Sequence, residues 1–204
     1  MVEAFQGEAR LALSCRFAYL LVNALHRHLE CRMAAARRQV RGSKYNLGET
    51  MTQVTQQDFT ANLLKLLKET FEEGGSFYLD KGAGLFQTLE AITPEAASRA
   101  PVPGAPTVAA HCAHVSYYVR VVHNFIVGKE QEVDWPSSWQ VHDVGPREWE
   151  ALKGELRSAY ETLKQALESV QSWGDARLGD SMAVVAHTAY HLGAIRQVVR
   201  AVQS

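Results

Sequence analysis

Four stretches of this chain repeat apolar residues at steps of three and four, and no other feature constrains the fold as strongly. In the clearest stretch, which follows Pro146, the repeating residues would share one face of a helix: Trp149, Leu152, Leu156, Tyr160, Leu163, Leu167 and Val170. The other three stretches cover 55–74, 107–128 and the residues from about Asp180 to the C-terminus. No stretch alternates apolar and polar residues as a half-buried strand does. The sequence therefore predicts an all-α fold.

The segments between these stretches contain the residues that end helices. Prolines and a glycine within 101–106 mark a loop before the second long helix. The segment 133–146 is interpreted as a long crossover before the third helix, and Gly174 is expected to end that helix. Thr93 is expected to begin one brief turn of helix. Four long amphipathic helices with one long connection are typical of a four-helix bundle.

Charge divides the chain into two parts. Residues 1–50 carry eight basic and four acidic side chains, whereas residues 51–204 carry thirteen basic and eighteen acidic ones. We interpret 1–50 as an N-terminal extension, helical or poorly ordered, and 51–204 as the bundle. Because Met51 begins a self-sufficient pattern, a wrongly chosen start upstream of it is an alternative explanation of the first part.

Overall composition narrows the expected partners and compartment. A formal net charge of −1 gives no electrostatic case for binding nucleic acid. The most apolar segment, 11–25, is shorter than the roughly 20 residues that span a membrane. An amphipathic helix on a membrane or on a partner is the alternative for that segment. The three cysteines (Cys15, Cys31 and Cys112) form no CxxC motif, which favours a reducing cytoplasm.

Histidines interrupt two of the helical seams that should be buried. His187 and His191 lie four residues apart in the last helix, and His111 and His114 lie three apart in the second. Burying an imidazole without a partner costs on the order of 1–3 kcal/mol. One divalent cation would satisfy the i,i+4 pair and a third histidine from another helix, and it would keep an open coordination position. Hydrogen-bonded core histidines are the alternative, because such pairs also arise by chance.

At these residues the sequence resembles the DinB/YfiT superfamily of small helical metal-binding proteins. The similarity covers roughly 54–203 and is most specific over 107–114 and 186–197. Members form four-helix bundles in which three histidines hold a divalent metal such as zinc, nickel or iron. The resemblance thus implies a metal cofactor whose identity the sequence does not give, and a homodimer, since members often pair through helix faces.

The resemblance also implies which histidines are ligands. In the family the first ligand lies seven positions after the Ser or Thr that opens the second helix, which is His114 when counted from Thr107. The H-x-x-x-H pair of the fourth helix corresponds to His187 and His191. His111 is then an additional neighbour, and an exchange between His111 and His114 stays open as an alternative.

Two neighbours of this pattern also carry expectations. Gly193 is expected to let another helix approach closely, because it has no side chain. Thr188 stands where H-E-x-x-H metalloproteases carry their glutamate base, which excludes a zincin protease.

Relatives in this superfamily include thiol transferases, so the resemblance implies that activity. Such an enzyme joins a low-molecular-weight thiol, for example bacillithiol or mycothiol, to an electrophile. The metal ion would deprotonate the thiol, so the protein need not supply a nucleophile, and no catalytic side chain is assigned. Metal-dependent hydrolysis, with bound water at a pKa of about 7, is the alternative enzyme. A non-catalytic bundle stabilised by its metal is the alternative outside catalysis.

Overall fold

The computed structural model describes residues 53–75 and 77–203, and within them the regular secondary structure is helical. The four long helices are α2 (Gln56–Phe71), α5 (Val108–Ile126), α6 (Pro146–Glu168) and α7 (Asp175–Gln203). Between them lie α3 (Leu85–Glu90), α4 (Pro94–Ala97) and one 3-10 turn, η2 (Pro136–Trp139). No strand occurs in the described ranges, so the prediction of an all-α fold is confirmed.

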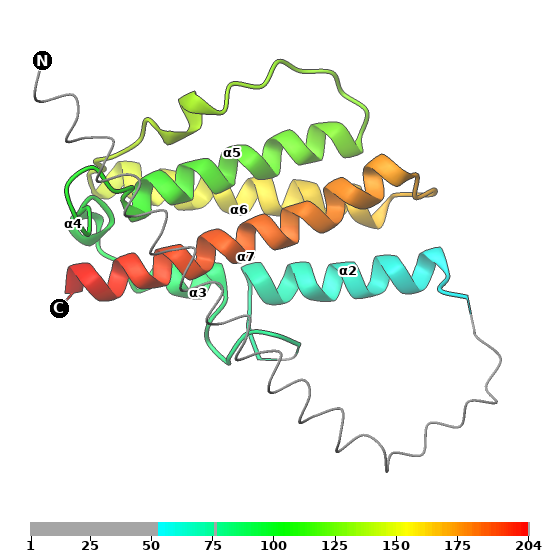
Figure 1. Ribbon diagram of the computed structural model, residues 1–204, viewed down its shortest axis with the longest axis horizontal. Coiled ribbons are helices and arrows are strands. Elements are labelled where there is room, and N and C mark those ends of the chain that lie inside the picture. The colour runs from blue at the N-terminus through cyan, green and yellow to red at the C-terminus, as the bar shows by residue number, and fades with distance from the viewer. Residues whose placement is uncertain (1–52, 76, 204) are drawn as a thin grey trace, which may run out of the picture. The chain divides into compact units, whose positions relative to one another are not determined.

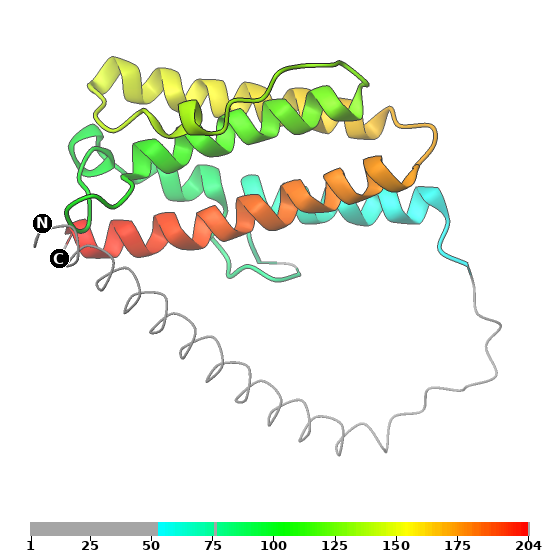
Figure 2. The same cartoon turned by 45° about the horizontal axis from the view of Figure 1, so that its top comes forward.

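The four long helices form a bundle in which each has two neighbours. Helix α5 packs against α6 and α7, and α2 packs against the same two helices from the other side. Figures 1 and 2 show these helices side by side, with the segment between α5 and α6 running back along α5. The bundle thus brings the middle of α5 next to the middle of α7, where the predicted histidines lie.

Capping side chains begin the long helices at the expected places. Thr55 and Asp58 form a reciprocal capping box at the start of α2, and the Thr107 side chain accepts from the Ala110 N–H at the start of α5. Pro146 is the first residue of α6, where its missing N–H leaves no partner unsatisfied. These capping residues and the proline explain why the N-termini of three helices could be predicted from the sequence.

The connection between α6 and α7 differs from the expectation. Helix α6 ends at Glu168 instead of continuing to Gly174, and α7 begins at Asp175, five residues before the expected start. The Leu178 N–H donates to the Gly174 carbonyl at 3.0 Å, which closes the first turn of α7. Gly179 therefore lies inside a helix, a position that costs only about 1 kcal/mol relative to alanine and that α7 tolerates.

The core consists mainly of buried apolar residues from the four long helices and from α3. All the named residues of the α6 seam are buried except Val170, which is partly buried against the core. Phe71 of α2 stacks on Tyr160 of α6 at 4.7 Å between ring centroids, and Phe86 of α3 completes this aromatic cluster. Phe125 follows His111, His114, Tyr118 and Val122 at helical steps on α5, which predicts that it is buried, but it is 43% exposed and that prediction is wrong.

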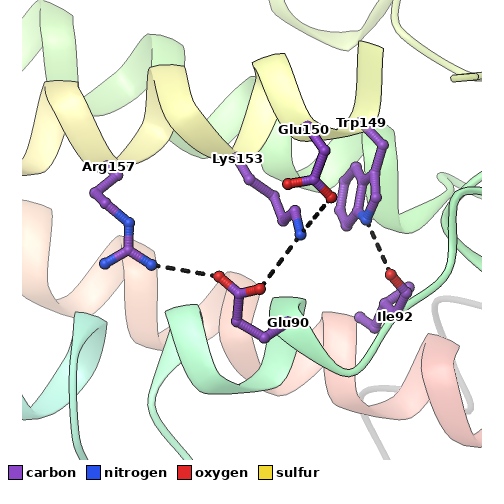
Figure 3. Close-up of polar contacts among 6 residues, drawn as sticks. All are labelled: Glu90, Ile92, Trp149, Glu150, Lys153 and Arg157. Carbon is purple, nitrogen blue, oxygen red and sulfur yellow. Dashed lines mark hydrogen bonds and ion pairs between the residues drawn. The ribbon is translucent and has the colours of Figure 1, made fainter. Parts of the chain in front are cut away.

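The short helix α3 and the turn that follows it are attached to α6 by polar contacts (Figure 3). The indole N–H of Trp149 donates to the Ile92 carbonyl at 2.9 Å, and both groups are buried. Glu90 pairs with Lys153 at 3.4 Å and with Arg157 at 3.5 Å. The carboxylate of Glu90 is largely exposed, so these ion pairs contribute little, and the buried hydrogen bond is the stronger link.

A buried carboxylate fixes the loop that follows α2. The Glu69 side chain is 2% exposed and accepts hydrogen bonds from the backbone N–H groups of Gly75, Phe77, Tyr78 and Leu79. Among the described residues, four backbone N–H donors surround this one carboxylate and replace the hydrogen bonds it would make to water. Nothing in the sequence pattern indicated this arrangement, because its partners are backbone groups.

Two further expectations concern positions away from this loop. Gly193 was expected to allow a close helix approach, but it is exposed and a Cβ there would meet no atom within 4 Å, so that expectation was wrong. The N-terminal extension predicted over 1–50 lies outside the described residues and stays a prediction. Among the helices that the structure describes, none combines the length and the apolar character needed to cross a membrane.

Candidate metal centre

Three histidines from α5 and α7 converge at the middle of the bundle. One nitrogen from each of His114, His187 and His191 lies within 4.8 Å of the other two. The Nε2 atom of His187 is 3.2 Å from the Nε2 atom of His114 and 3.2 Å from that of His191. We refer to these three residues as the histidine cluster. The structure thus brings together the three residues named from the sequence, and the cluster contains no carboxylate or thiol.

Helix geometry explains the convergence. His187 and His191 are separated by one turn of α7, and α5 runs antiparallel beside them. His114 therefore faces His187, and His111, one turn earlier on α5, faces His191. Because the surrounding core residues are mostly apolar, the polar partners of these imidazoles among the described residues are chiefly one another and Ser138.

The ring of His114 is oriented by the crossover between α5 and α6. Its Nδ1 atom is 2.7 Å from the Ser138 hydroxyl, which itself donates to the Trp135 carbonyl at 2.6 Å. Since the hydroxyl proton is used in that bond, Ser138 accepts from His114, and the imidazole proton lies on Nδ1. The Nε2 lone pair of His114 therefore points into the cluster. Trp139 stacks on the same ring with centroids 4.0 Å apart.

The other two rings have different surroundings. The Nδ1 atom of His191 lies 3.0 Å from the Nδ1 atom of His111. His187 is covered by Tyr118, whose ring is nearly parallel at 3.6 Å between centroids. The Nδ1 atom of His187 is buried and has no hydrogen-bond partner among the described residues. The Nδ1 atoms of His114 and His191 thus have hydrogen-bond partners, whereas the ring of His187 is held by stacking and by its Nε2 contacts within the cluster.

Burial keeps these imidazoles neutral at physiological pH. Loss of solvent, with a smaller effect of the His114 imidazole, lowers the pKa of His111 and of His187 to about 4. Burial and the three neighbouring imidazoles lower the pKa of His191 to about 3, and burial also lowers the pKa of His114. Neutral imidazole is the form that binds a metal ion, so no proton has to leave the cluster before an ion enters.

The donor set fits a divalent transition metal. Donor nitrogens 2.0–2.1 Å from a tetrahedral zinc ion are separated by about 3.3–3.4 Å, and the two Nε2 separations of 3.2 Å lie close to that value. Three imidazoles suit zinc, nickel or iron, and they leave at least one coordination position for another molecule. That open position is typical of catalytic rather than structural zinc sites.

Four aromatic residues border the histidine cluster. Trp135 is 40% exposed and contacts Tyr118 at 5.6 Å between ring centroids, and Tyr118 in turn stacks on His187. Tyr190 is 71% exposed and touches His191 edge-on. Trp139 is partly buried between His111 and His114 and acts as packing for the rings.

The cluster does not include Cys112, His123 or His142. Cys112 is fully buried, and burial raises the pKa of its thiol to about 12, so it is a core residue. His123 contacts Asn124, and His142 is exposed. Ser138 was missed from the sequence because an isolated serine in a crossover carries no periodic signal.

Comparison with known proteins gives one family. The family model described as the DinB superfamily matches residues 82–195, which is more than half of the chain and includes the whole histidine cluster. No curated protein and no solved structure matches the chain.

Proposed function

Because the chain belongs to the DinB superfamily, whose members bind metal ions, we propose that His114, His187 and His191 bind one divalent metal ion that activates a low-molecular-weight thiol for transfer to an electrophile. The proposal is supported by the convergence of three neutral imidazoles. The Nε2 atom of His187 lies 3.2 Å from the Nε2 atom of His114 and 3.2 Å from that of His191. Zinc, nickel and iron all suit this donor set.

The chemistry follows from the charge of the ligand set. A divalent ion held by three neutral imidazoles keeps its full +2 charge and would strongly lower the pKa of a thiol or a water molecule bound at the open position. The protein then has to hold the donor rings, keep them unprotonated and leave one side accessible. Ser138 and Trp139 orient His114, Tyr118 covers His187, and burial keeps all three rings neutral.

The surroundings of the cluster favour a thiol over water as the activated group. A thiol ionises near pH 8.5 and water near 15.7, so water needs more help from a nearby base. Among the described residues, the group of side chains that could hold an ion consists of three histidines and includes no carboxylate. A centre with no carboxylate among its ligands is better suited to the more acidic ligand.

Elemental analysis tests the metal part of the proposal. The full chain, purified without added metal or chelator, should contain about one equivalent of a divalent transition metal per chain. His187→Ala should abolish that content, because it removes the imidazole that contacts both others. His142→Ala is the matched control, since His142 is exposed and outside the cluster. Equal metal content in the two variants would refute the metal site.

A conjugation assay tests the transferase part. The metal-loaded chain should consume bacillithiol, mycothiol or another small thiol in the presence of a generic electrophile, and the His187→Ala variant should not. Ester or amide hydrolysis without a thiol would instead favour the hydrolase alternative. Metal binding without any reaction would leave the non-catalytic bundle as the function. A homodimer, a cytoplasmic location and the lack of a nucleic-acid or membrane partner stay predictions.

A further inference from the structure

His111 lies directly behind a member of the histidine cluster. It occupies α5 one turn before His114, is only 7% exposed, and places its Nδ1 atom 3.0 Å from the Nδ1 atom of His191. The two ring centroids are 5.2 Å apart, and Trp139 contacts the His111 ring edge-on at 5.4 Å. Two buried nitrogens at hydrogen-bond distance require one proton between them.

The direction of this hydrogen bond follows from the cluster. His191 directs Nε2 toward His187, so the proton of its neutral ring has to lie on Nδ1 if Nε2 is to offer a lone pair to an ion. His191 is then the donor, and the Nδ1 atom of His111 accepts. His111 consequently carries its own proton on Nε2. The Nδ1 atom of His111 therefore faces the Nδ1 atom of His191, and not the Nε2 atom that His191 directs toward His187.

We propose that His111 is a positioning residue that accepts the His191 Nδ1–H and so fixes the proton and the ring orientation of His191 before an ion arrives. The inference rests on the proposed function, in which His191 is a ligand. Ser138 performs the same task for His114, with a hydroxyl oxygen as the acceptor. Residues that hold a ligand's second nitrogen in this way typically contribute 10- to 100-fold in metal affinity.

This role also bears on whether His111 or His114 is the ligand from α5. If His111 were the ligand, its ring would have to turn away from the Nδ1 atom of His191 and toward the Nε2 atoms of His187 and His191. In the structure His114 already supplies the nitrogen 3.2 Å from His187, and Ser138 fixes its proton. His111 therefore supports the centre from outside it.

Histidine nitrogen NMR of the ¹⁵N-labelled full chain tests the proton position directly. In both metal-free and zinc-loaded protein, His191 should carry its proton on Nδ1 and His111 on Nε2. A metal-free spectrum with the His191 proton on Nε2 would overturn the proposal. Because that spectrum needs no metal, it decides the role of His111 even if zinc fails to bind, an outcome that would instead overturn the proposed function.

Two substitutions separate the hydrogen bond from packing. His111→Leu removes the acceptor and should weaken zinc binding roughly 10- to 100-fold, measured by competition with a chromophoric chelator. His111→Gln keeps an acceptor oxygen and should stay within a few-fold of the parent chain. His123→Leu on the same helix is the control and should bind zinc as the parent does. Unchanged affinity in His111→Leu, or equal losses in the Leu and Gln variants, would overturn the proposal.

Discussion

Tyr118 lies flat on His187, with an angle of 11° between the ring planes and 3.6 Å between their centroids. His187 contacts both other members of the cluster, yet its Nδ1 atom has no hydrogen-bond partner in the described part of the chain. The stacked tyrosine is therefore the main contact that orients this ring. Its contribution to the metal centre can be measured by changing the ring and the hydroxyl separately.

Replacing Tyr118 by leucine should weaken zinc binding roughly two- to tenfold, because a stacked aromatic pair contributes about 0.5–1.5 kcal/mol. Tyr118→Phe retains the ring and should bind zinc like the parent chain. Competition with a chromophoric chelator gives both affinities. A loss in the phenylalanine variant as large as in the leucine variant would assign the effect to the hydroxyl group instead of the stack.

Removing the metal should leave the helical bundle folded. The cluster occupies one region of a bundle that has a continuous apolar core, so the core does not depend on an ion. Melting followed by circular dichroism, with and without chelator, should show a cooperative transition in both cases and a higher midpoint with metal. Unfolding at room temperature on addition of chelator would indicate a structural metal instead.

Acid should destabilise the metal-free protein before most carboxylates titrate. The folded-state pKa values of about 4 for His111 and His187 and about 3 for His191 lie below the value near 6.5 of an unfolded chain. Below pH 6.5 the unfolded state therefore binds more protons, so the free energy of unfolding falls as pH falls from about 6.5 toward 4.

Urea unfolding at a series of pH values in chelator measures this dependence. His191→Phe removes the imidazole with the lowest pKa and should reduce the slope between pH 6.5 and 4.5 relative to the parent chain. His142→Ala is the control, because that side chain is exposed. An identical slope in the His191→Phe variant and the parent would contradict the lowered pKa of His191.

Cys112 should be inert in the folded protein. Its thiol is fully buried, and a pKa raised to about 12 leaves almost no thiolate at neutral pH. In a chain with Cys15→Ser and Cys31→Ser, a thiol-specific dye should react with Cys112 only after denaturant is added. Any conjugation activity should survive Cys112→Ala, since the proposed thiol comes from the substrate. Fast labelling without denaturant would contradict the burial.

Two glycines should respond in opposite ways to alanine. Gly193→Ala should stabilise the protein by about 1 kcal/mol, because a Cβ there meets no atom within 4 Å and alanine favours the helix. Gly84→Ala should destabilise it, since the Cβ would lie 2.7 Å from the Glu72 carbonyl oxygen. Urea unfolding measures both changes. A loss of stability in Gly193→Ala would restore the close helix approach first expected there.

The helices and the cluster were predictable because both depend on periodicity. The α6 seam and the i,i+4 pair of His187 and His191 repeat at helical steps, so their shared faces follow from the sequence alone. Selecting His114 over His111 required the family resemblance, because both lie on the same face of α5. The spacing alone could not separate a residue that faces His187 from one that faces His191.

The missed features involve partners that sequence spacing does not reveal. Ser138 reaches His114 from a crossover whose path is set by contacts with α5, including the Tyr117 hydroxyl that accepts from the Asp134 N–H. Glu69 binds backbone groups, which every residue type offers. The early start of α7 at Asp175 reflects a turn closed by Gly174, a residue type that also ends helices.

The attachment of the crossover also restricts how this protein can vary in length. Ser138 binds a ring of the cluster, and the Thr107 hydroxyl donates to the His142 carbonyl, so inserting or deleting one residue between positions 134 and 142 would displace Ser138 from His114. The connection from 169 to 174 lies at the other end of α6, where the indole N–H of Trp173 donates to the Thr60 hydroxyl of α2. An insertion in that second connection that leaves Trp173 in place should therefore be tolerated better than one in the crossover, which should keep its length.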